Sequence, residues 1–354
     1  MTYKIVHWGT GNVGALALRT MMERSDYEVV GHYAFNAEKV GKDSAELVGL
    51  PASGLKTTDD IDALIALKPD VLAWFGNAMF DPLDAARTIA RFLEAGINVV
   101  TPGLYELGSP DAAPPEFREI IDPACAKGNS TVYSTGYDPG FATTQLAVTM
   151  LGVAHRVDQV RLQEFADYGA YPDEQTMREY MGFGKSMGTP SALSDGAMQK
   201  RVWGPTVHDN ARALGLEIDG YDFRLFAAPA LENRQTSIGL IRKGTMSVLR
   251  FELIGFVKGE ERVVVEHVNW MHVDDIPADW PIPPRFEGKV APVGYRNVIR
   301  GEPTVAVEVQ VPTTRDGLLG TALHATNSIP MVVAALPGIL SQAKILPYGP
   351  GPLK

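Results

Sequence analysis

Three glycines at a fixed spacing follow the first apolar run of the chain. The run Tyr3–Trp8 has the composition of a strand, and the segment after it has the period of a helix. Between them lies a G-x-G-x-x-G sequence, formed by Gly9, Thr10, Gly11, Asn12, Val13 and Gly14. The first glycine permits a tight turn, the second lets backbone N–H groups approach a pyrophosphate, and the third lets the helix pack closely. The pattern predicts a dinucleotide-binding loop, and its alternative is an ordinary glycine-rich turn.

The end of the second strand-like run, Tyr27–Tyr33, bears on which dinucleotide is bound. An Asp or Glu at this point usually accepts hydrogen bonds from the ribose 2′-OH of NAD. Here Asn36 occupies the expected position and Lys39 follows it. Because an uncharged amide beside a lysine tolerates a 2′-phosphate, we expect NADP(H), with NAD(H) as a further possibility. The alternative is that Lys39 is simply a solvated helix residue.

A carboxylate lies in the loop after another strand-like run, Asn98–Thr101. The loop reads Thr101-Pro102-Gly103-Leu104-Tyr105-Glu106-Leu107-Gly108. In an open α/β sheet, ligands bind at the carboxyl ends of the strands. Thr101, and the pair Gly76 and Asn77 after the run Val71–Phe75, are therefore predicted cofactor contacts. Glu106, held among apolar neighbours, could act as a general acid or base, and a solvated loop glutamate is the competing interpretation.

The elements that must position these residues alternate between strand and helix. Capping signals mark the segment from Asp81 to Gly96 as a helix, with Asp81 as N-cap, Pro82 in the first turn and Gly96 as the stop. The other expected helices are Asn12–Glu23, Asp59–Leu67 and Pro115–Lys127, and the last expected strand of the series is Thr131–Ser134. This alternation predicts a parallel sheet covered by helices, in a Rossmann-type dinucleotide-binding domain.

The pattern changes near Gly136. Strand-type runs follow one another with turn signals between them, at Val157–Phe165, Tyr221–Ala227, Thr245–Val257, Arg262–His272 and Thr304–Val311. They predict an α+β domain with a mainly antiparallel sheet. A helix is expected over Gly317–Leu336. We therefore expect an α/β protein with one domain from 1–140 plus about 316–354, and a substrate-binding and dimerisation domain from 141–315.

Composition excludes several classes of protein. The 354 residues carry 32 Lys and Arg against 42 Asp and Glu, a net charge of −10, which disfavours a nucleic-acid partner. Cys125 is the single cysteine, so no internal disulfide and no cysteine metal site is expected. His267 and His272 stand an odd number of residues apart on a predicted strand, which points them to opposite faces and predicts no shared metal. We expect no membrane span and a cytoplasmic protein, since neither a secretory signal nor a long apolar run is found.

Four stretches taken together resemble one family. They are Gly9–Gly14, Glu38–Asp43, Gly136–Phe141, and Asn327–Pro330 with Ala335–Gly338. They are similar to the dihydrodipicolinate-reductase-like superfamily, and within it to the group of 2,4-diaminopentanoate dehydrogenase and the native amine dehydrogenases. The stretches Glu164–Tyr168 and Met181–Gly184 resemble that group too. The resemblance covers nearly the whole chain, and only the first motif is common elsewhere.

The resemblance implies a reaction and a set of site residues. Glu106 matches the catalytic loop glutamate of the amine dehydrogenases, which implies NAD(P)H-dependent reductive amination of an aldehyde or ketone with ammonia, reversible as oxidative deamination. The expected pocket residues are Phe141, Tyr168, Tyr171 and Tyr137, with core packing as the alternative, and the pair Tyr137-Asp138 departs from the family pattern. Asn327 is expected to touch the nicotinamide or its ribose, or else to cap a helix. A homodimer is also expected.

Two other functions remain open from the sequence. The fold could transfer hydride to another C=N or C=O substrate, such as a diamino acid or a cyclic imine, without free ammonia. The chain could also be a non-catalytic NADP(H)-binding redox sensor. The carboxylate at a strand end disfavours the sensor, because a sensor has no need of a general acid or base.

Overall fold

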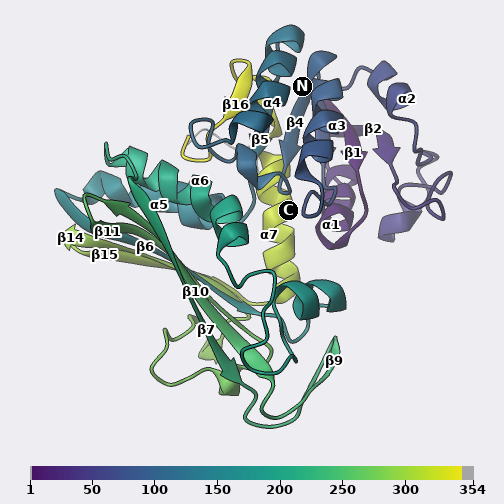
Figure 1. Cartoon of the computed structure of the whole chain (residues 1–354). Coiled ribbons are helices and arrows are strands. Elements are labelled where there is room, and N and C mark those ends of the chain that lie inside the picture. The colour runs from purple at the N-terminus through teal and green to yellow at the C-terminus, as the bar shows by residue number, and fades with distance from the viewer. Residues whose placement is uncertain (1, 345–354) are drawn as a thin grey trace. The chain divides into compact units, whose positions relative to one another are not determined.

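The computed structural model describes residues 2–344, and the chain divides into two compact units (Figure 1). The first unit comprises the chain up to Phe141 and from Leu318 onward, and the second is Ala142–Gly317. The first holds a parallel sheet with helices on both faces, and the second holds a mainly antiparallel sheet. The expected fold class is therefore confirmed. No helix among residues 2–344 combines the length and the apolar character needed to cross a bilayer.

The sheet of the first unit has six parallel strands in the order β16-β5-β4-β3-β1-β2. The strands are β1 (Tyr3–Trp8), β2 (Tyr27–Tyr33), β3 (Val71–Trp74), β4 (Asn98–Thr101), β5 (Thr131–Ser134) and β16 (Gly338–Leu340). Every residue of β3 and β5 is buried, as expected for strands covered on both faces. The sequence did not predict β16, because a segment of three residues is too short to show the alternation of apolar and polar residues that marks a strand.

Helices cover both faces of this sheet. Apolar side chains of α2 (Ile61–Ala66), α3 (Pro82–Glu94) and α4 (Pro115–Gly128) pack on one face, and those of α1 (Asn12–Met22), α7 (Thr314–Asn327) and α8 (Ile329–Val333) pack on the other. The N-cap prediction for α3 is confirmed, since the Asp81 carboxylate accepts the Asp84 N–H at 2.9 Å. The single helix expected over Gly317–Leu336 is wrong. The chain breaks into α7 and α8 at Ser328, and Pro330, which lacks an N–H, lies in the first turn of α8.

The second unit has a six-stranded sheet in the order β15-β14-β6-β11-β10-β7. The strands are β6 (Arg156–Asp167), β7 (Gly220–Pro229), β10 (Met246–Val257), β11 (Glu260–Trp270), β14 (Val293–Glu302) and β15 (Val305–Val311). All neighbouring strands are antiparallel except β6 and β11, which pair in parallel. Because β11 ends at Trp270, His272 lies beyond the strand, and the prediction that both histidines share one strand is wrong.

One face of this sheet is covered by α5 (Leu146–Met150) and α6 (Ala197–Ala213). The sequence did not predict α6, because Pro205 in its interior removes a hydrogen bond and disfavours a helix there. Pro205 and Val207, two residues further on, are buried, and Val207 packs against the sheet. Tertiary burial therefore outweighs the local preference in this segment.

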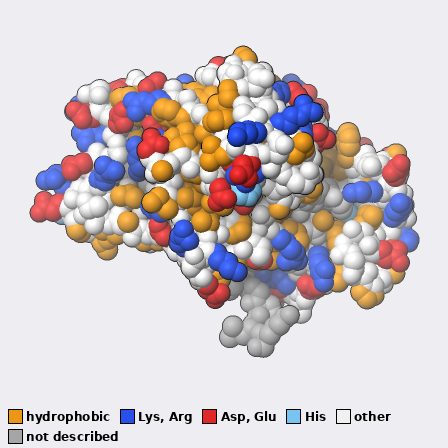
Figure 2. All heavy atoms as spheres, turned by 90° about the horizontal axis from the view of Figure 1, so that it is seen from below, with side chains coloured by type: hydrophobic (Ala, Val, Ile, Leu, Met, Phe, Trp, Pro, Cys, Tyr) orange, Lys and Arg blue, Asp and Glu red, His pale blue; other side chains and the backbone are white. Residues whose placement is uncertain are grey.

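The opposite face of the sheet carries ion pairs. Glu252 and Glu266 stand directly opposite each other on β10 and β11, an arrangement that is unfavourable for two like charges. Arg161 from β6 contacts Glu266 at 2.6 Å and Glu252 at 2.8 Å, and Arg250 contacts Glu266 at 2.7 Å. Figure 2 shows hydrophobic side chains with basic and acidic ones set between them on the side seen from below. The arginines thus neutralise two carboxylates that the strand register places together.

A buried ion pair supports the loop after β11. Arg234 donates to the Asp275 carboxylate at 2.8 Å, and Ser247 donates to its other oxygen at 2.7 Å. Burial by itself would raise the pKa of Asp275, but these hydrogen bonds hold that pKa below its ordinary value. A depressed carboxyl pKa contributes stability above the unfolded-state pKa near 4, and that stability is lost as pH falls through the folded-state pKa.

We expect Asp275→Ala to lower the free energy of unfolding by about 1.5–3 kcal/mol at pH 7, because it removes the charged acceptor of the Arg234 and Ser247 hydrogen bonds. Urea unfolding at pH 7 and at pH 3 measures the effect, and the deficit should shrink at the lower pH. The control is Asp274→Ala, which removes a neighbouring carboxylate that is mostly exposed. Equal stability of the two variants at pH 7 would contradict the prediction.

Candidate active site

The glycine loop follows β1 and turns into α1 through two close approaches. Gly9 has φ +91°, which side chains rarely tolerate, and a Cβ there would lie 3.0 Å from the Phe75 carbonyl oxygen. A Cβ at Gly14 would lie 2.7 Å from the Gly9 carbonyl oxygen. A Cβ at Gly11 would meet no atom within 4 Å. The first and third glycines are thus required for packing, while the space beside the second is open, as a pyrophosphate-binding loop requires.

The loops after three neighbouring strands touch one another. The Gly9 backbone lies against Phe75 after β3, and a Cβ at Gly103 after β4 would lie 3.0 Å from the Gly76 carbonyl oxygen. The carboxyl ends of parallel strands meet at one edge of a sheet, where α/β proteins bind their ligands. The structure therefore brings the glycine loop, Gly76 and the loop that carries Glu106 to the same edge.

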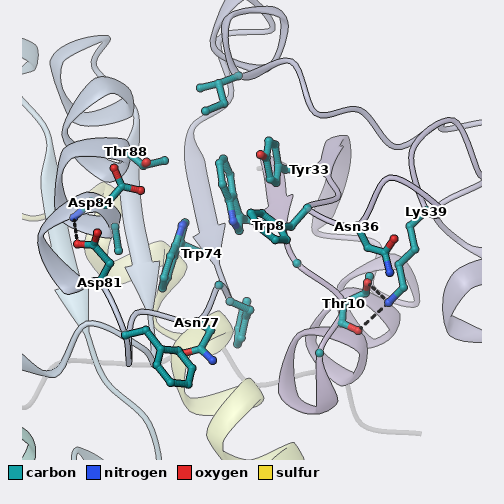
Figure 3. A pocket seen from close by; sticks show the side chains of 18 residues that line it. Trp8, Thr10, Tyr33, Asn36, Lys39, Trp74, Asn77, Asp81, Asp84 and Thr88 are labelled. Atoms are coloured by element: carbon teal, nitrogen blue, oxygen red, sulfur yellow. Dashed lines mark hydrogen bonds between the residues drawn. The ribbon is translucent and has the colours of Figure 1, made fainter.

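A cavity of about 640 Å³ opens at this edge (Figure 3). It is lined by seven of the predicted cofactor residues, namely Gly9, Thr10, Gly11, Asn36, Lys39, Gly76 and Asn77. Asn12, Val13 and Gly14 belong to the first turn of α1 beside the loop. Thr101 is buried, and its hydroxyl accepts the Gly103 N–H at 3.0 Å, which shapes the next loop. The volume and the open glycine loop fit part of a dinucleotide.

Lys39 reaches the glycine loop from the segment after β2. Its ammonium group donates to the Thr10 hydroxyl at 2.8 Å and to the Thr10 carbonyl oxygen at 3.3 Å. The side chains of Asn36, Lys39 and Thr10 lie together at one side of the cavity (Figure 3). The alternative of a solvated helix residue is wrong, because Lys39 is part of a turn and its ammonium group is bound by the loop.

Aromatic residues form a part of the cavity that the sequence reasoning missed. Trp8 and Tyr33, the last residues of β1 and β2, are paired in the sheet register, and their rings stack at 3.5 Å and 8°. Trp74, the last residue of β3, is the partner of Trp8 on the other side. The sequence did contain a signal for these rings, because the three expected strands Tyr3–Trp8, Tyr27–Tyr33 and Val71–Phe75 each end in an aromatic residue. Only their adjacency in the sheet shows that these rings line one cavity.

Glu106 lies in a short 3-10 helix, Tyr105–Leu107, and its side chain is buried at 3% exposure. Leu104 and Leu107 on either side of it are completely buried and anchor the turn. Gln342, far along the chain, donates its backbone N–H to the Gly108 carbonyl and its side-chain amide to the Ser134 carbonyl, both at 2.9 Å. The interpretation of Glu106 as a solvated loop residue is therefore wrong.

Tyr137, Phe141 and Asn327 line a second cavity of the first unit, of about 200 Å³. Its other lining residues are Gly320, Leu323 and His324, so no Lys, Arg, Asp or Glu is among them. Burial raises the pKa of Tyr137 and lowers the pKa of His324 to about 4, which leaves both side chains neutral at pH 7. The Asn327 amide oxygen accepts from Arg24 at 2.8 Å. This cavity is aromatic and uncharged.

Tyr168 and Tyr171 lie in the second unit. Their rings meet edge to face at 5.7 Å, and both pack against an apolar cluster that includes Phe183. In the same unit, His267 contacts the Glu164 carboxylate at 3.1 Å and stacks on Phe251. The structure thus brings the two tyrosines together, while their contact with a substrate stays a prediction.

The parallel sheet and the glycine loop at its carboxyl edge define a protein of the Rossmann class. The family model described as the 2,4-diaminopentanoate dehydrogenase C-terminal domain matches residues 141–348. The amine dehydrogenase of Streptomyces virginiae is 33% identical over 335 residues, which cover 94% of this chain and 91% of that protein. The chain therefore belongs to the family of the 2,4-diaminopentanoate and amine dehydrogenases, and the resemblance seen in the sequence is confirmed.

A solved structure shows the same fold. The amine dehydrogenase from Mycobacterium smegmatis superposes with a TM-score of 0.77 at 21% sequence identity, and the match covers 98% of this chain and 97% of that one. The match spans both units, so each of them has the fold seen in that structure.

Proposed function

We propose that this chain is an NAD(P)H-dependent amine dehydrogenase, which aminates an aldehyde or ketone with ammonia and in reverse deaminates an amine. The observation that carries the proposal is the buried carboxylate of Glu106, in the loop that touches the edge of the dinucleotide cavity. The name of the Streptomyces relative supports it. A bound nicotinamide dinucleotide would supply or accept the hydride.

The residues around the larger cavity support NADP(H) as the preferred cofactor, with NAD(H) also accepted. The open side of Gly11 leaves room for the pyrophosphate. Lys39 is held at the cavity wall beside Asn36, where its ammonium group could pair with a 2′-phosphate. The position at which NAD-specific proteins carry an Asp or Glu holds Asn36 here, so no carboxylate there would repel that phosphate.

Glu106 supplies proton transfer in the proposed reaction. Its carboxylate takes a proton from ammonium, and the neutral ammonia that results attacks the carbonyl carbon. The same carboxyl then returns the proton to the carbinolamine hydroxyl, which leaves as water. The iminium that remains is a cation, and the carboxylate stabilises it in a site that excludes water. Addition of hydride to the iminium carbon then gives the amine, so that one carbonyl, one ammonium and one hydride yield one amine and one water.

Ammonium dependence tests the proposal. NADPH oxidation by the purified protein is measured with a panel of aliphatic aldehydes and ketones, in ammonium chloride and in sodium chloride of equal ionic strength. We expect oxidation in ammonium chloride alone, with one amine formed for each NADPH consumed. Turnover that is independent of ammonium would refute the proposal and favour reduction of another C=O or C=N substrate. NADPH binding without any turnover would favour a redox sensor.

We also propose a division of labour between the units. The first unit binds the dinucleotide, and the second carries substrate contacts, with Tyr168 and Tyr171 among them, and forms a homodimer. The charged face of the second sheet supports the dimer, because a two-fold interface sets one patch against its own copy. On that face Phe226 is 39% exposed beside the Arg250 guanidinium, so its ring offers an apolar surface that a two-fold axis would set against the same ring of the second copy.

We expect Phe226→Asp to convert the dimer to a monomer, because it removes the exposed ring from the proposed interface and adds one carboxylate to each copy. Light scattering should give twice the chain mass of 38.3 kDa for the unaltered protein and the single mass for the variant. The control is Val153→Asp, at an exposed apolar residue just after α5. A measured mass of 38.3 kDa for the unaltered protein at micromolar concentration would refute the dimer.

A further inference from the structure

Two histidines lie buried beneath the glycine loop. His7 on β1 and His32 on β2 are partners in the sheet register, and both are fully buried. Their rings are 5.2 Å apart, and the His7 ring also contacts Phe75 at 5.5 Å. The proposed chemistry uses neither residue.

Only one of the two histidines touches the loop. The His7 Nε2 atom lies 2.6 Å from the Gly9 carbonyl oxygen. Because a carbonyl oxygen can only accept, the ring nitrogen donates this hydrogen bond. Neither ring nitrogen of His32 has a hydrogen-bond partner in the described part of the chain. The two side chains therefore share strand pairing and burial, but only the His7 ring is hydrogen-bonded to the glycine loop and contacts Phe75.

The hydrogen bond sets the orientation of a peptide group. In a trans peptide the C=O and the following N–H point in opposite directions. With the Gly9 carbonyl turned toward His7, the Thr10 N–H points away from His7. The Gly9 carbonyl oxygen also lies close to the first turn of α1. The approach is so close that a Cβ at Gly14 would lie 2.7 Å from that oxygen.

The His7 ring is neutral in this position. Burial, assisted by the neighbouring His32, lowers the pKa of His7 to about 3. At physiological pH the ring therefore carries a single N–H, and that N–H serves the Gly9 carbonyl. The side chain supplies a hydrogen-bond donor under the loop without a buried charge.

We propose that His7 is a positioning residue for the dinucleotide pyrophosphate. Its hydrogen bond holds the Gly9 carbonyl pointing toward His7. The Thr10 N–H then points to the opposite side of the peptide, where the loop borders the cavity. This inference rests on the proposed dinucleotide function and names the residue that prepares the loop. His7 makes no contact with the ligand itself and acts through the backbone.

Three variants test the proposal. His7→Phe keeps a ring of similar size and loses the donor, His7→Gln keeps a donor at nearly the same reach, and His32→Phe is the matched control. The Kd is measured for NADPH and for adenosine 2′-monophosphate, which has no pyrophosphate. A thermal melt of each variant verifies folding, and His7→Leu replaces His7→Phe if the larger ring does not fit.

We expect His7→Phe to raise the Kd for NADPH by about 5- to 10-fold, the usual range for one lost hydrogen bond. The Kd for adenosine 2′-monophosphate should change by less than about twofold, and His7→Gln should restore most of the NADPH affinity. His32→Phe should bind NADPH like the unaltered protein. A role in packing alone would predict equal effects at both positions.

Unchanged NADPH affinity in His7→Phe, or an equal loss in His32→Phe, would overturn the inference and leave the proposed function intact. An equal loss for both ligands would overturn it too, since the effect would then not depend on the pyrophosphate. If the unaltered protein binds neither NADPH nor NADH, the proposed function itself fails, and the inference fails with it.

Discussion

We expect Glu106→Gln to lower kcat/KM for the proposed reductive amination by about 10³-fold, and to change the Kd for NADPH by less than about twofold. Glutamine has almost the shape of glutamate, but it can neither take the proton of ammonium nor stabilise the iminium cation. Since Glu106 is buried between two anchored leucines, the substitution keeps the packing of the turn. Steady-state kinetics in ammonium buffer and a fluorescence titration with NADPH measure the two quantities separately.

Two controls accompany the Glu106 variant. Glu106→Asp retains a carboxylate with a shorter reach and should keep more activity than Glu106→Gln. Glu116→Gln changes an exposed glutamate in the first turn of α4 and should be as active as the unaltered protein. Wild-type amination by Glu106→Gln would refute the proposed mechanism, whereas a parallel loss of NADPH binding would assign Glu106 a structural role.

We expect Lys39→Ala to raise KM for NADPH by about 10- to 100-fold and to leave KM for NADH nearly unchanged. A hydrogen bond to a charged group contributes about 1.5–3 kcal/mol, which corresponds to this range. The 2′-phosphate is the only group that distinguishes the two cofactors, so a loss restricted to NADPH identifies the contact. The ratio of kcat/KM for the two cofactors is the measured quantity.

Lys42→Ala is the matched control for Lys39→Ala. Lys42 lies in the same segment but is exposed, so its removal should leave the cofactor ratio unchanged. Equal losses for NADPH and NADH in Lys39→Ala would contradict a phosphate contact. They would show instead that Lys39 supports the glycine loop through its bonds to Thr10.

Local signals in the sequence predicted the elements around the cavity correctly. The strands β1, β2, β4 and β5 begin and end where expected, because short apolar β-branched runs between turn residues have few other conformations open to them. Asp81 and Pro82 marked the start of α3 because capping depends on atoms within one turn. The glycine loop was found for the same reason, since its requirements are steric and lie within six residues.

Elements that depend on distant partners were missed or misjudged. Helix α6 contains Pro205 and forms because its apolar side packs on the second sheet. Strand β16 is three residues long and exists through its pairing with β5. No local pattern encodes either contact, and the sequence shows only the unfavourable proline or the short apolar run.

The sequence by itself determined the fold class, the family and the position of the glycine loop. The tertiary structure decided the state of individual side chains. Glu106 is buried because its turn is anchored by leucines and bonded to Gln342, and Lys39 is bound to Thr10 because β1 and β2 are adjacent in the sheet. Burial and ion contacts are sums over atoms that the chain brings together from far apart, so residue type and spacing alone do not specify them.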